Sequence, residues 1–249
     1  MVTFHGTPPT YLTLDPLEAA GVRHAFTTRH HGSFAARPGQ PFGDDAAPAA
    51  LTGLGLDAPA VRYARQVHGT ACLVADDARP GLVGEGDALL TTRPRLPLAV
   101  FTADCLSIVV VDPDRRALAV AHAGWRGTVA GLAGGLVEAL VRHTGARADR
   151  LQAGIGPSIG PCCYEVDAPV IDPLRAAFPA DWARWARPQA PGKWWLDLWQ
   201  ANADQLVAAG VPPDAVANPR LCTACGSDLF FSYRREGRGG SLAALACLD

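Results

Sequence analysis

The sequence predicts a mixed α+β fold, an α/β sandwich in a single domain that covers residues 1–249. Strand-like apolar runs are frequent up to residue 121, and helical and strand-like segments then mix without a strict βαβ alternation. A hydrophobic share of 49% over 249 residues is enough for a sizeable core and excludes an intrinsically disordered chain. The sequence has no internal repeat and no long linker, which favours one domain over two.

Short apolar runs bounded by turn residues predict the strands. Up to residue 121 these runs are 22–27, 61–67, 71–75, 88–92, 98–102, 108–111 and 117–121. Further strands are predicted at 151–155 and 194–197, and an apolar run at 242–248 closes the domain. The stretch 29–48 is rich in Gly and Pro and is long enough to be a functional or mobile loop.

Two helices are predicted from apolar periodicity and stop signals. The first covers 129–140 and is ended by Gly145. The second covers 198–209 and is stopped by Gly210 and Pro212. The apolar stripe of the first helix consists of Val129, Leu132, Leu136 and Leu140.

The charges of the chain are nearly balanced, with a formal net charge of −2. Such a chain lacks the basic surface that binding to nucleic acid or to an anionic membrane requires. The apolar stretch 96–111 contains Thr102, Asp104 and Ser107, so it is unsuited to span a bilayer. The N-terminal residues lack the basic and apolar segments of a signal peptide, and we expect a cytoplasmic protein.

Three strand-like runs each lead into a side chain that can bind a metal, namely His68, Cys105 and His122. If these ends meet at one edge of a sheet, two imidazoles and one thiolate suit Zn²⁺ and leave a fourth position for water or substrate. Taken singly, each residue has a simpler interpretation. A cysteine at a strand end is most often a small buried hydrophobe, and a lone histidine is most often a hydrogen-bonded core residue. The spacing alone leaves both interpretations open.

Gly124 and Arg126 stand just before the first predicted helix, where free N–H groups and a guanidinium can hold phosphate or carboxylate. A glycine turn with a surface arginine is the alternative. Cys222-Thr-Ala-Cys225 has the spacing of a zinc or redox pair, although packing cysteines give the same pattern. The adjacent Cys162-Cys163 pair is too close in sequence for an easy disulfide.

Two other patterns are less informative. Gly156-Pro-Ser158-Ile-Gly160 has the form of a nucleophile elbow, but no histidine follows His143 to complete a hydrolase triad. Arg234-Arg235 could line a substrate rim or could simply be solvated.

Six segments together resemble the YfiH-like family, also called the multicopper polyphenol oxidase or laccase-domain family. They are Gln66-Val-His68-Gly, Asp87-Ala-Leu-Leu-Thr, Thr102-Ala-Asp-Cys105, His122-Ala-Gly-Trp-Arg-Gly, Ile155-Gly-Pro-Ser-Ile-Gly-Pro-Cys-Cys-Tyr-Glu-Val and Phe230-Phe-Ser-Tyr-Arg-Arg. The resemblance implies a single α/β sandwich, distantly similar to the catalytic domain of cytotoxic necrotizing factor toxins. It also implies zinc-dependent phosphorolysis of adenosine, inosine, guanosine and methylthioadenosine, with adenosine deamination alongside.

The resemblance places the family's metal ligands on His68, Cys105 and His122, the same three residues that the strand ends suggest. Cys105 and Arg126 are then the expected catalytic residues. Arg29, Gly124 and Arg126 are expected to bind substrate or phosphate. Asp104 and Asp87 are the candidates for the acid–base residue. Zinc is the expected cofactor, with copper as the alternative, and the protein is expected to be a monomer or a weak homo-oligomer.

The sequence departs from the family pattern at two places. Thr27-Thr-Arg29 is followed by a segment, 35–44, without the asparagine of the family's Ser-Leu-Asn-Leu-Gly run, and the terminal Thr-Gly-Arg is replaced by Arg238-Gly-Gly-Ser241. Both changes concern the expected outer rim of the substrate site.

Three other functions remain alternatives. A copper oxidase needs about ten histidines, usually in H-x-H pairs, whereas this chain has seven and no such pair. A cysteine hydrolase or amidase acting on peptidoglycan precursors would use Cys105 as nucleophile with His122 as base. A non-catalytic, zinc-stabilised binding protein is the last alternative.

Overall fold

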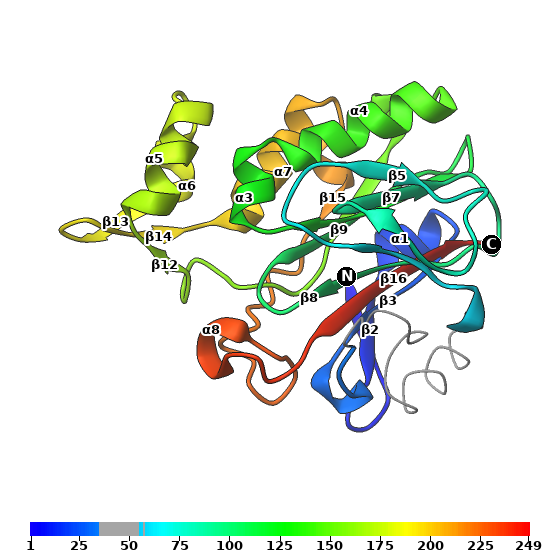
Figure 1. Ribbon diagram of the computed structural model, residues 1–249, viewed down its shortest axis with the longest axis horizontal. Helices are drawn as coiled ribbons and strands as arrows, with labels where there is room; N and C mark the ends of the chain where they lie inside the picture. The colour runs from blue at the N-terminus through cyan, green and yellow to red at the C-terminus, as the bar shows by residue number, and fades with distance from the viewer. Residues whose placement is uncertain (35–54, 57) are drawn as a thin grey trace.

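The computed structural model describes residues 1–34, 55, 56 and 58–249. Within them, two large sheets pack face to face, and helices cover the outer face of one sheet. A small third sheet lies to one side with α5 (Ala168–Ala177) and α6 (Trp182–Trp185) (Figure 1). The predicted mixed α+β fold is confirmed. The single-domain organisation and the likeness to cytotoxic necrotizing factor toxins stay predictions.

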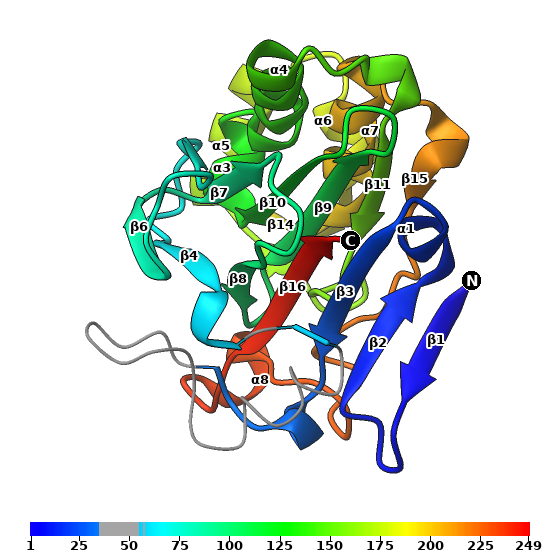
Figure 2. The ribbon, with the colours of Figure 1, turned by 90° about the vertical axis from the view of Figure 1, so that its right-hand side faces the viewer.

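The first sheet joins both ends of the chain, because the C-terminal strand β16 pairs with β3 and β8. In Figure 2 the antiparallel run from β1 to β3 and β16 faces the reader. The strand order of this sheet is β1 (Val2–His5), β2 (Tyr11–Leu14), β3 (Val22–Thr27), β16 (Leu242–Leu248), β8 (Leu98–Thr102), β4 (Arg62–Arg65) and β6 (Gly81–Glu85).

The second sheet lies between the first sheet and the helices. Its strand order is β15 (Val216–Ala217), β11 (Gln152–Ile155), β9 (Leu106–Asp112), β10 (Ala117–Ala123), β7 (Ala88–Thr91) and β5 (Cys72–Val74). The small third sheet consists of β12 (Glu165–Val166), β14 (Lys193–Leu196) and β13 (Ala186–Ala190).

The helices of the described residues are short except for three. They are α1 (Asp15–Ala19), α3 (Trp125–Val129), α4 (Leu132–Thr144), α5 (Ala168–Ala177), α6 (Trp182–Trp185), α7 (Leu198–Ala208) and α8 (Tyr233–Glu236), with single 3₁₀ turns at Arg29–His31, Ala58–Ala60, Ala148–Arg150 and Pro213–Ala215. Within the described part of the chain, none combines the length and apolar character needed to cross a bilayer.

The period of two along β9 explains why its sequence is apolar throughout. Ile108 and Val110 face the core under α4 and α7, whereas Val109 and Val111 face the core between the two large sheets. A strand with helices on one side and a second sheet on the other has no solvated face, so neither set of side chains is polar. This double burial fixes the register of the strands that carry the site.

The predicted helix over 129–140 is divided in two by the structure. Gly131 has a left-handed backbone, with φ of +78°, and separates α3 from α4. Gly145 ends α4 in the same conformation, as predicted. The stretch 35–48 of the predicted loop lies outside the described residues, as does the segment 35–44 that lacks the family's asparagine.

Candidate metal centre and adjoining cavities

Three side chains from different elements converge inside the sandwich. His68 follows β4, Cys105 lies in the turn between β8 and β9, and His122 lies near the end of β10. Their ligand atoms all lie within 4.8 Å of one another, and the two imidazole centroids are 4.9 Å apart. The sequence predicted that these strand ends meet at one sheet edge. They meet instead between two sheets, because β4 and β8 belong to the first sheet and β10 to the second.

Asp87 is a fully buried carboxylate that links two of these residues. Its Oδ1 accepts hydrogen bonds from His122 Nδ1 at 2.9 Å and from the N–H of His68 at 3.0 Å. Its Oδ2 accepts the N–H groups of Val67 at 3.1 Å and of Gly69 at 2.7 Å. Because Nδ1 of His122 is engaged with Asp87, its Nε2 is the nitrogen left for a metal.

The turn at His68 needs this support. His68 has a left-handed backbone with φ of +60°, which costs a non-glycine residue roughly 1–2 kcal/mol. The N–H groups that donate to Asp87 come from this same turn, so the carboxylate offsets the strain and fixes the direction of the imidazole.

The charges within the cluster favour a thiolate. Burial alone would raise the pKa of Cys105, but hydrogen bonds and charge interactions with His122 and His68 lower it to about 6. Burial alone would lower the pKa of His122, but its hydrogen bonds with Asp87 and Cys105 raise it to about 9. A thiolate at neutral pH is the form of cysteine that binds metals and attacks electrophiles.

Gly124 lies directly against the cluster. A Cβ atom at this position would be 2.9 Å from Cys105 Sγ and 3.1 Å from His68 Cδ2. These distances are shorter than van der Waals contact, so any side chain here would displace a candidate ligand. The structure therefore gives Gly124 a steric reason to be glycine, and its predicted role in substrate or phosphate binding stays a prediction.

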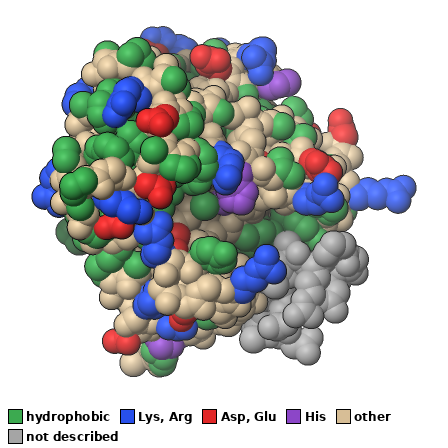
Figure 3. Space-filling model, turned by 60° about the vertical axis from the view of Figure 1, so that its left-hand side comes forward, with side chains coloured by type: hydrophobic (Ala, Val, Ile, Leu, Met, Phe, Trp, Pro, Cys, Tyr) green, Lys and Arg blue, Asp and Glu red, His purple; other side chains and the backbone are tan. Residues whose placement is uncertain are grey.

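Two cavities meet at the cluster and share His68, Ala103, Cys105 and Tyr233. The larger, of about 520 Å³, also reaches Phe101 and Gln66. The smaller, of about 280 Å³, has further walls of Trp125, Arg126, Ile159, Tyr164 and Arg234. His68 is exposed, so the cluster is open to solvent and ligands. Figure 3 shows a histidine next to a side chain of the Lys and Arg class on one face of the molecule.

The smaller cavity is lined by two arginines, Arg126 and Arg234, and by one carboxylate, that of Asp104. The Arg126 guanidinium lies 4.4 Å from the Trp125 ring, and no described carboxylate forms an ion pair with it. The Arg234 guanidinium lies 5.1 Å from the Tyr164 ring. Burial and the charge of Cys105 raise the pKa of Tyr164 to about 12, so its hydroxyl remains a hydrogen-bond donor at neutral pH. This wall is suited to an anion.

Asp104 adjoins Cys105, but both of its carboxylate oxygens already accept hydrogen bonds. The donors are Thr223 Oγ1 and the N–H of Arg234, each at 2.6 Å. The carbonyl of Asp104 also accepts the N–H of Ile159 at 2.9 Å. Asp104 thus connects the ligand turn to the loops that form the smaller cavity.

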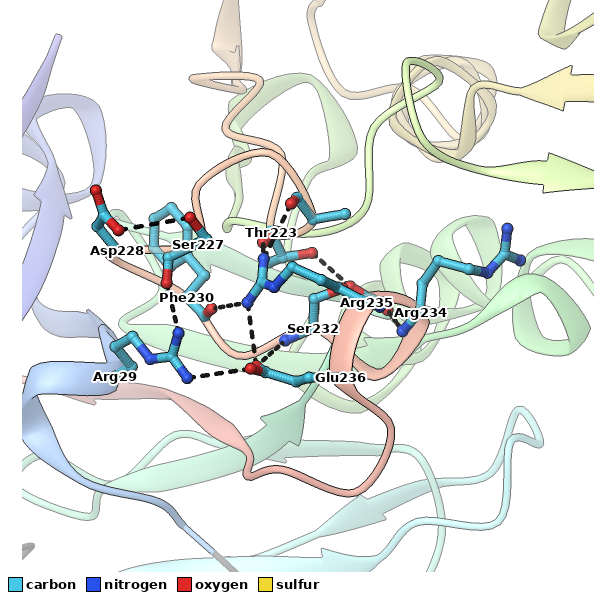
Figure 4. A network of polar contacts seen from close by, with 11 residues as sticks. Arg29, Thr223, Ser227, Asp228, Phe230, Ser232, Arg234, Arg235 and Glu236 are labelled. Atoms are coloured by element: carbon cyan, nitrogen blue, oxygen red, sulfur yellow. Dashed lines mark hydrogen bonds and ion pairs between the residues drawn. The ribbon is translucent and has the colours of Figure 1, made fainter.

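Arg29 forms hydrogen bonds with the C-terminal loops and is absent from the lining of both cavities. Its guanidinium donates to the Ser227 carbonyl and to Glu236, the latter at 3.2 Å (Figure 4). These bonds hold α8, which carries Arg234. Arg29 lines neither of the two cavities, and the substrate contact expected for it stays a prediction.

Gln66, Tyr164 and Tyr233 line the cavities but were not singled out from the sequence. Gln66 spans two strands, since its side-chain amide donates to the carbonyl of Phe101 and accepts its N–H, each at 2.7 Å. All three residues stand inside the segments that carry the family resemblance. Their place in these segments was the sequence feature that could have identified them as site residues.

Comparison with curated proteins finds enzymes of nucleoside metabolism. A Deinococcus radiodurans purine nucleoside phosphorylase is 37% identical over 90% of this chain and 88% of its own. Adenosine deaminase RL5, from an unknown prokaryotic organism, is 39% identical over 74% of this chain and 73% of its own. Purine nucleoside phosphorylase YlmD of Geobacillus stearothermophilus is 42% identical over 64% of this chain, and this match spans 58% of YlmD.

The fold is also that of solved structures. The Bacillus licheniformis protein YfiH has a TM-score of 0.89 at 29% identity, covering 99% of both chains. A family model described as multi-copper polyphenol oxidoreductase laccase matches residues 45–249. These matches confirm the resemblance drawn from the motifs, and the chain belongs to the multi-copper polyphenol oxidoreductase laccase family.

Proposed function

We propose that this chain is a zinc-dependent purine nucleoside phosphorylase that also deaminates adenosine. The proposed substrates are adenosine, inosine, guanosine and methylthioadenosine, with inorganic phosphate as cosubstrate. The observation that carries the proposal is an open cluster of two histidines and one cysteine between two cavities, one of them lined by two arginines. The activities named for the relatives support the same reaction class.

The donor set fits zinc. Two imidazoles and a thiolate are ligands that Zn²⁺ accepts, and three protein ligands leave the open position of a catalytic site. His68, Cys105 and His122 would hold the ion, with Asp87 fixing the orientation of His122. Bound zinc supplies Lewis-acid chemistry, which stabilises negative charge that develops on a substrate or on water.

In phosphorolysis, a phosphate oxygen forms a bond to C1′ of the ribose while the bond from C1′ to the purine nitrogen breaks. The electron pair leaves with the base, which takes up a proton. The products are the free purine and ribose 1-phosphate, or methylthioribose 1-phosphate from methylthioadenosine. Arg126 and Arg234 are positioned to hold phosphate in the smaller cavity, and the Tyr164 hydroxyl can donate to it. The larger cavity would receive the nucleoside. Orientation and charge neutralisation then supply most of the rate.

We assign Asp87 and Asp104 to positioning rather than to proton transfer with substrate. Every carboxylate oxygen of the two residues already accepts at least one hydrogen bond from the protein. Each bond leads to a residue of the cluster, to its turn or to a cavity loop. Neither residue needs to reach a substrate to affect the reaction.

The test is release of hypoxanthine from inosine by the zinc-loaded protein, with and without phosphate. We expect release with phosphate and none in its absence, and formation of ribose 1-phosphate in equal amount. When arsenate replaces phosphate, hypoxanthine release should continue without ribose 1-phosphate. Ammonia and adenine released from adenosine are measured separately to distinguish deamination from phosphorolysis. Absence of all turnover in zinc-loaded protein would exclude the proposal.

A cysteine hydrolase or amidase acting on peptidoglycan precursors is the second candidate. The contacts from Asp87 to His122 and from His122 to Cys105 also provide what a cysteine nucleophile needs, namely a thiolate beside an oriented imidazole. Metal removal separates the two functions. If the protein still hydrolysed peptidoglycan precursors after zinc was removed with a chelator, and lost this activity when Cys105 was alkylated, the hydrolase would be favoured.

The copper oxidase finds less support. Among the described residues, the only potential metal cluster that contains histidine holds two, His68 and His122. Copper oxidase chemistry needs several histidine-rich sites. A cytoplasmic location and a monomeric or weakly associated state are part of our proposal.

A further inference from the structure

A second cluster of potential metal ligands lies outside the residues that line the two cavities. Cys162 and Cys163 are in the connection from β11 to β12, and Cys222 and Cys225 follow β15. The four sulfur atoms all lie within 4.8 Å of one another. Cys225 Sγ is 3.5 Å from Cys162 Sγ and 3.4 Å from Cys163 Sγ. Two pairs of thiols that are about sixty residues apart in sequence are thus brought to one point.

These separations fit a shared ion better than a disulfide. Sulfur atoms in a disulfide are about 2.05 Å apart. Four sulfurs placed tetrahedrally about 2.3 Å from a zinc ion are about 3.8 Å from each other. We propose that Cys162, Cys163, Cys222 and Cys225 form a tetrathiolate site for a second zinc ion.

The backbone around the cluster is already arranged for this role. Residues 158 and 222 form a parallel bridge, with the Thr223 N–H donating to the Ser158 carbonyl at 3.0 Å. The Gly160 N–H donates to Cys222 Sγ at 3.2 Å, a contact that orients and stabilises a thiolate ligand. The C-x-x-C turn is closed by the Gly226 N–H, which donates to the Cys222 carbonyl at 2.9 Å. Backbone hydrogen bonds therefore hold the two loops together beside the four cysteines.

Charge also favours the site. Four thiolates and one Zn²⁺ carry a net charge of −2, and binding releases the thiol protons. Two guanidinium groups are bonded to the same loops. Arg234 donates to the carbonyl of Cys163 at 3.4 Å, and Arg235 donates to the carbonyl of Ala224 at 2.9 Å. Arg235 is also paired with Glu236 at 3.1 Å, so Arg234 is the main cation that lowers the excess negative charge, and it lies between this site and the smaller cavity.

The site is structural, because the protein supplies all four ligands and leaves no position for a substrate. The loops that it joins also form the wall of the smaller cavity. Tyr164 follows Cys163 directly, and Thr223, next to Cys222, donates to Asp104. The second ion would therefore fix the position of the cavity wall without contacting the reactants.

Metal analysis of the full-length protein, purified under reducing conditions with zinc present, tests this inference. We expect about two zinc ions per chain in the unmodified protein and about one in Cys162→Ala/Cys225→Ala. Cys72→Ala removes a half-buried cysteine outside both clusters and serves as the matched control, with about two ions expected.

A second measurement does not depend on the folding of the cysteine variants. In His68→Ala/His122→Ala, which keeps the four cysteines, X-ray absorption at the zinc edge should show sulfur ligands alone at about 2.3 Å. A single ion that is lost in His68→Ala/His122→Ala, nitrogen ligands in this variant, or a Cys162–Cys225 disulfide that forms in place of zinc binding would overturn the inference. Metal content is measured apart from nucleoside turnover, so this result is independent of the proposed function.

Discussion

Replacing Asp87 by asparagine keeps the shape of the side chain but removes its charge and turns one acceptor into a donor. Oδ1 accepts from His68 N–H and His122 Nδ1, and Oδ2 accepts from Val67 N–H and Gly69 N–H. Either orientation of the amide therefore places its NH₂ group against two donors. A tautomer change at His122 would relieve one of these conflicts, but it would put the ring proton on Nε2, the nitrogen needed for the metal.

The loss of folding stability in Asp87→Asn can be estimated from these hydrogen bonds. A hydrogen bond to a charged group contributes about 1.5–3 kcal/mol, and two are lost, so we expect about 3–6 kcal/mol less stability. Loss of a partner that orients a ligand also weakens metal binding roughly 10- to 100-fold. Zinc affinity is measured by competition with a chromophoric chelator, and stability by denaturant unfolding of the metal-free protein.

Asp76→Asn is the matched control. Asp76 also accepts several hydrogen bonds in a turn, from Thr91 and Thr92, but it contacts no candidate ligand. We expect this variant to lose stability and to keep its zinc affinity. If Asp87→Asn bound zinc as tightly as the unmodified protein, the carboxylate would not orient the ligands and the reasoning would be refuted.

Three further predictions concern the same site. Gly124→Ala should weaken zinc binding at least roughly tenfold, because its Cβ would meet Cys105. In contrast, Gly135→Ala in α4, where an added Cβ has nothing within 4 Å, should raise the free energy of unfolding by about 0.5–1 kcal/mol. In metal-free protein, alkylation of Cys105 should reach half its maximal rate near pH 6, where the thiolate forms. Bound zinc should protect Cys105 from alkylation. A midpoint above pH 8 would contradict the contacts of Cys105 with His122 and His68 that lower its pKa. Arg126→Ala should raise the KM for phosphate roughly 10- to 100-fold, and exposed Arg187→Ala should leave it unchanged; equal KM values in both would remove Arg126 from the phosphate site.

Elements that are buried along most of their length were predictable. β3 and β8 have the predicted bounds, because all but one residue of each strand is buried. β8 is apolar up to Thr102, whereas β3 contains Arg23 and His24 among its apolar residues. β13 was missed, since most of its side chains are exposed and its strand conformation depends on pairing with β14. α5 was missed because Pro173 interrupts its helical pattern. The local sequence therefore predicts secondary structure best where consecutive residues are buried.

The site residues also divide into those that local sequence could identify and those that depend on contacts between distant segments. His68, Cys105 and His122 could be proposed because each stands at or just after a strand-like run. The four bonds of Asp87 could not be proposed, since they join a turn and a strand about twenty to thirty-five residues apart. The contact of Gly124 with Cys105 and the approach of Cys162 to Cys225 likewise depend on packing between distant segments.

The position of the His68, Cys105 and His122 cluster between two sheets couples metal binding to folding. An ion held there would join a turn anchored in the first sheet to a strand of the second, so separating the sheets would require releasing it. A ligand that binds only the folded state adds about 4 kcal/mol of stability at a concentration of 1,000 times its Kd. Zinc availability would then set how long the enzyme persists as well as how fast it works, and hydrogen exchange in β10 should slow when zinc is added.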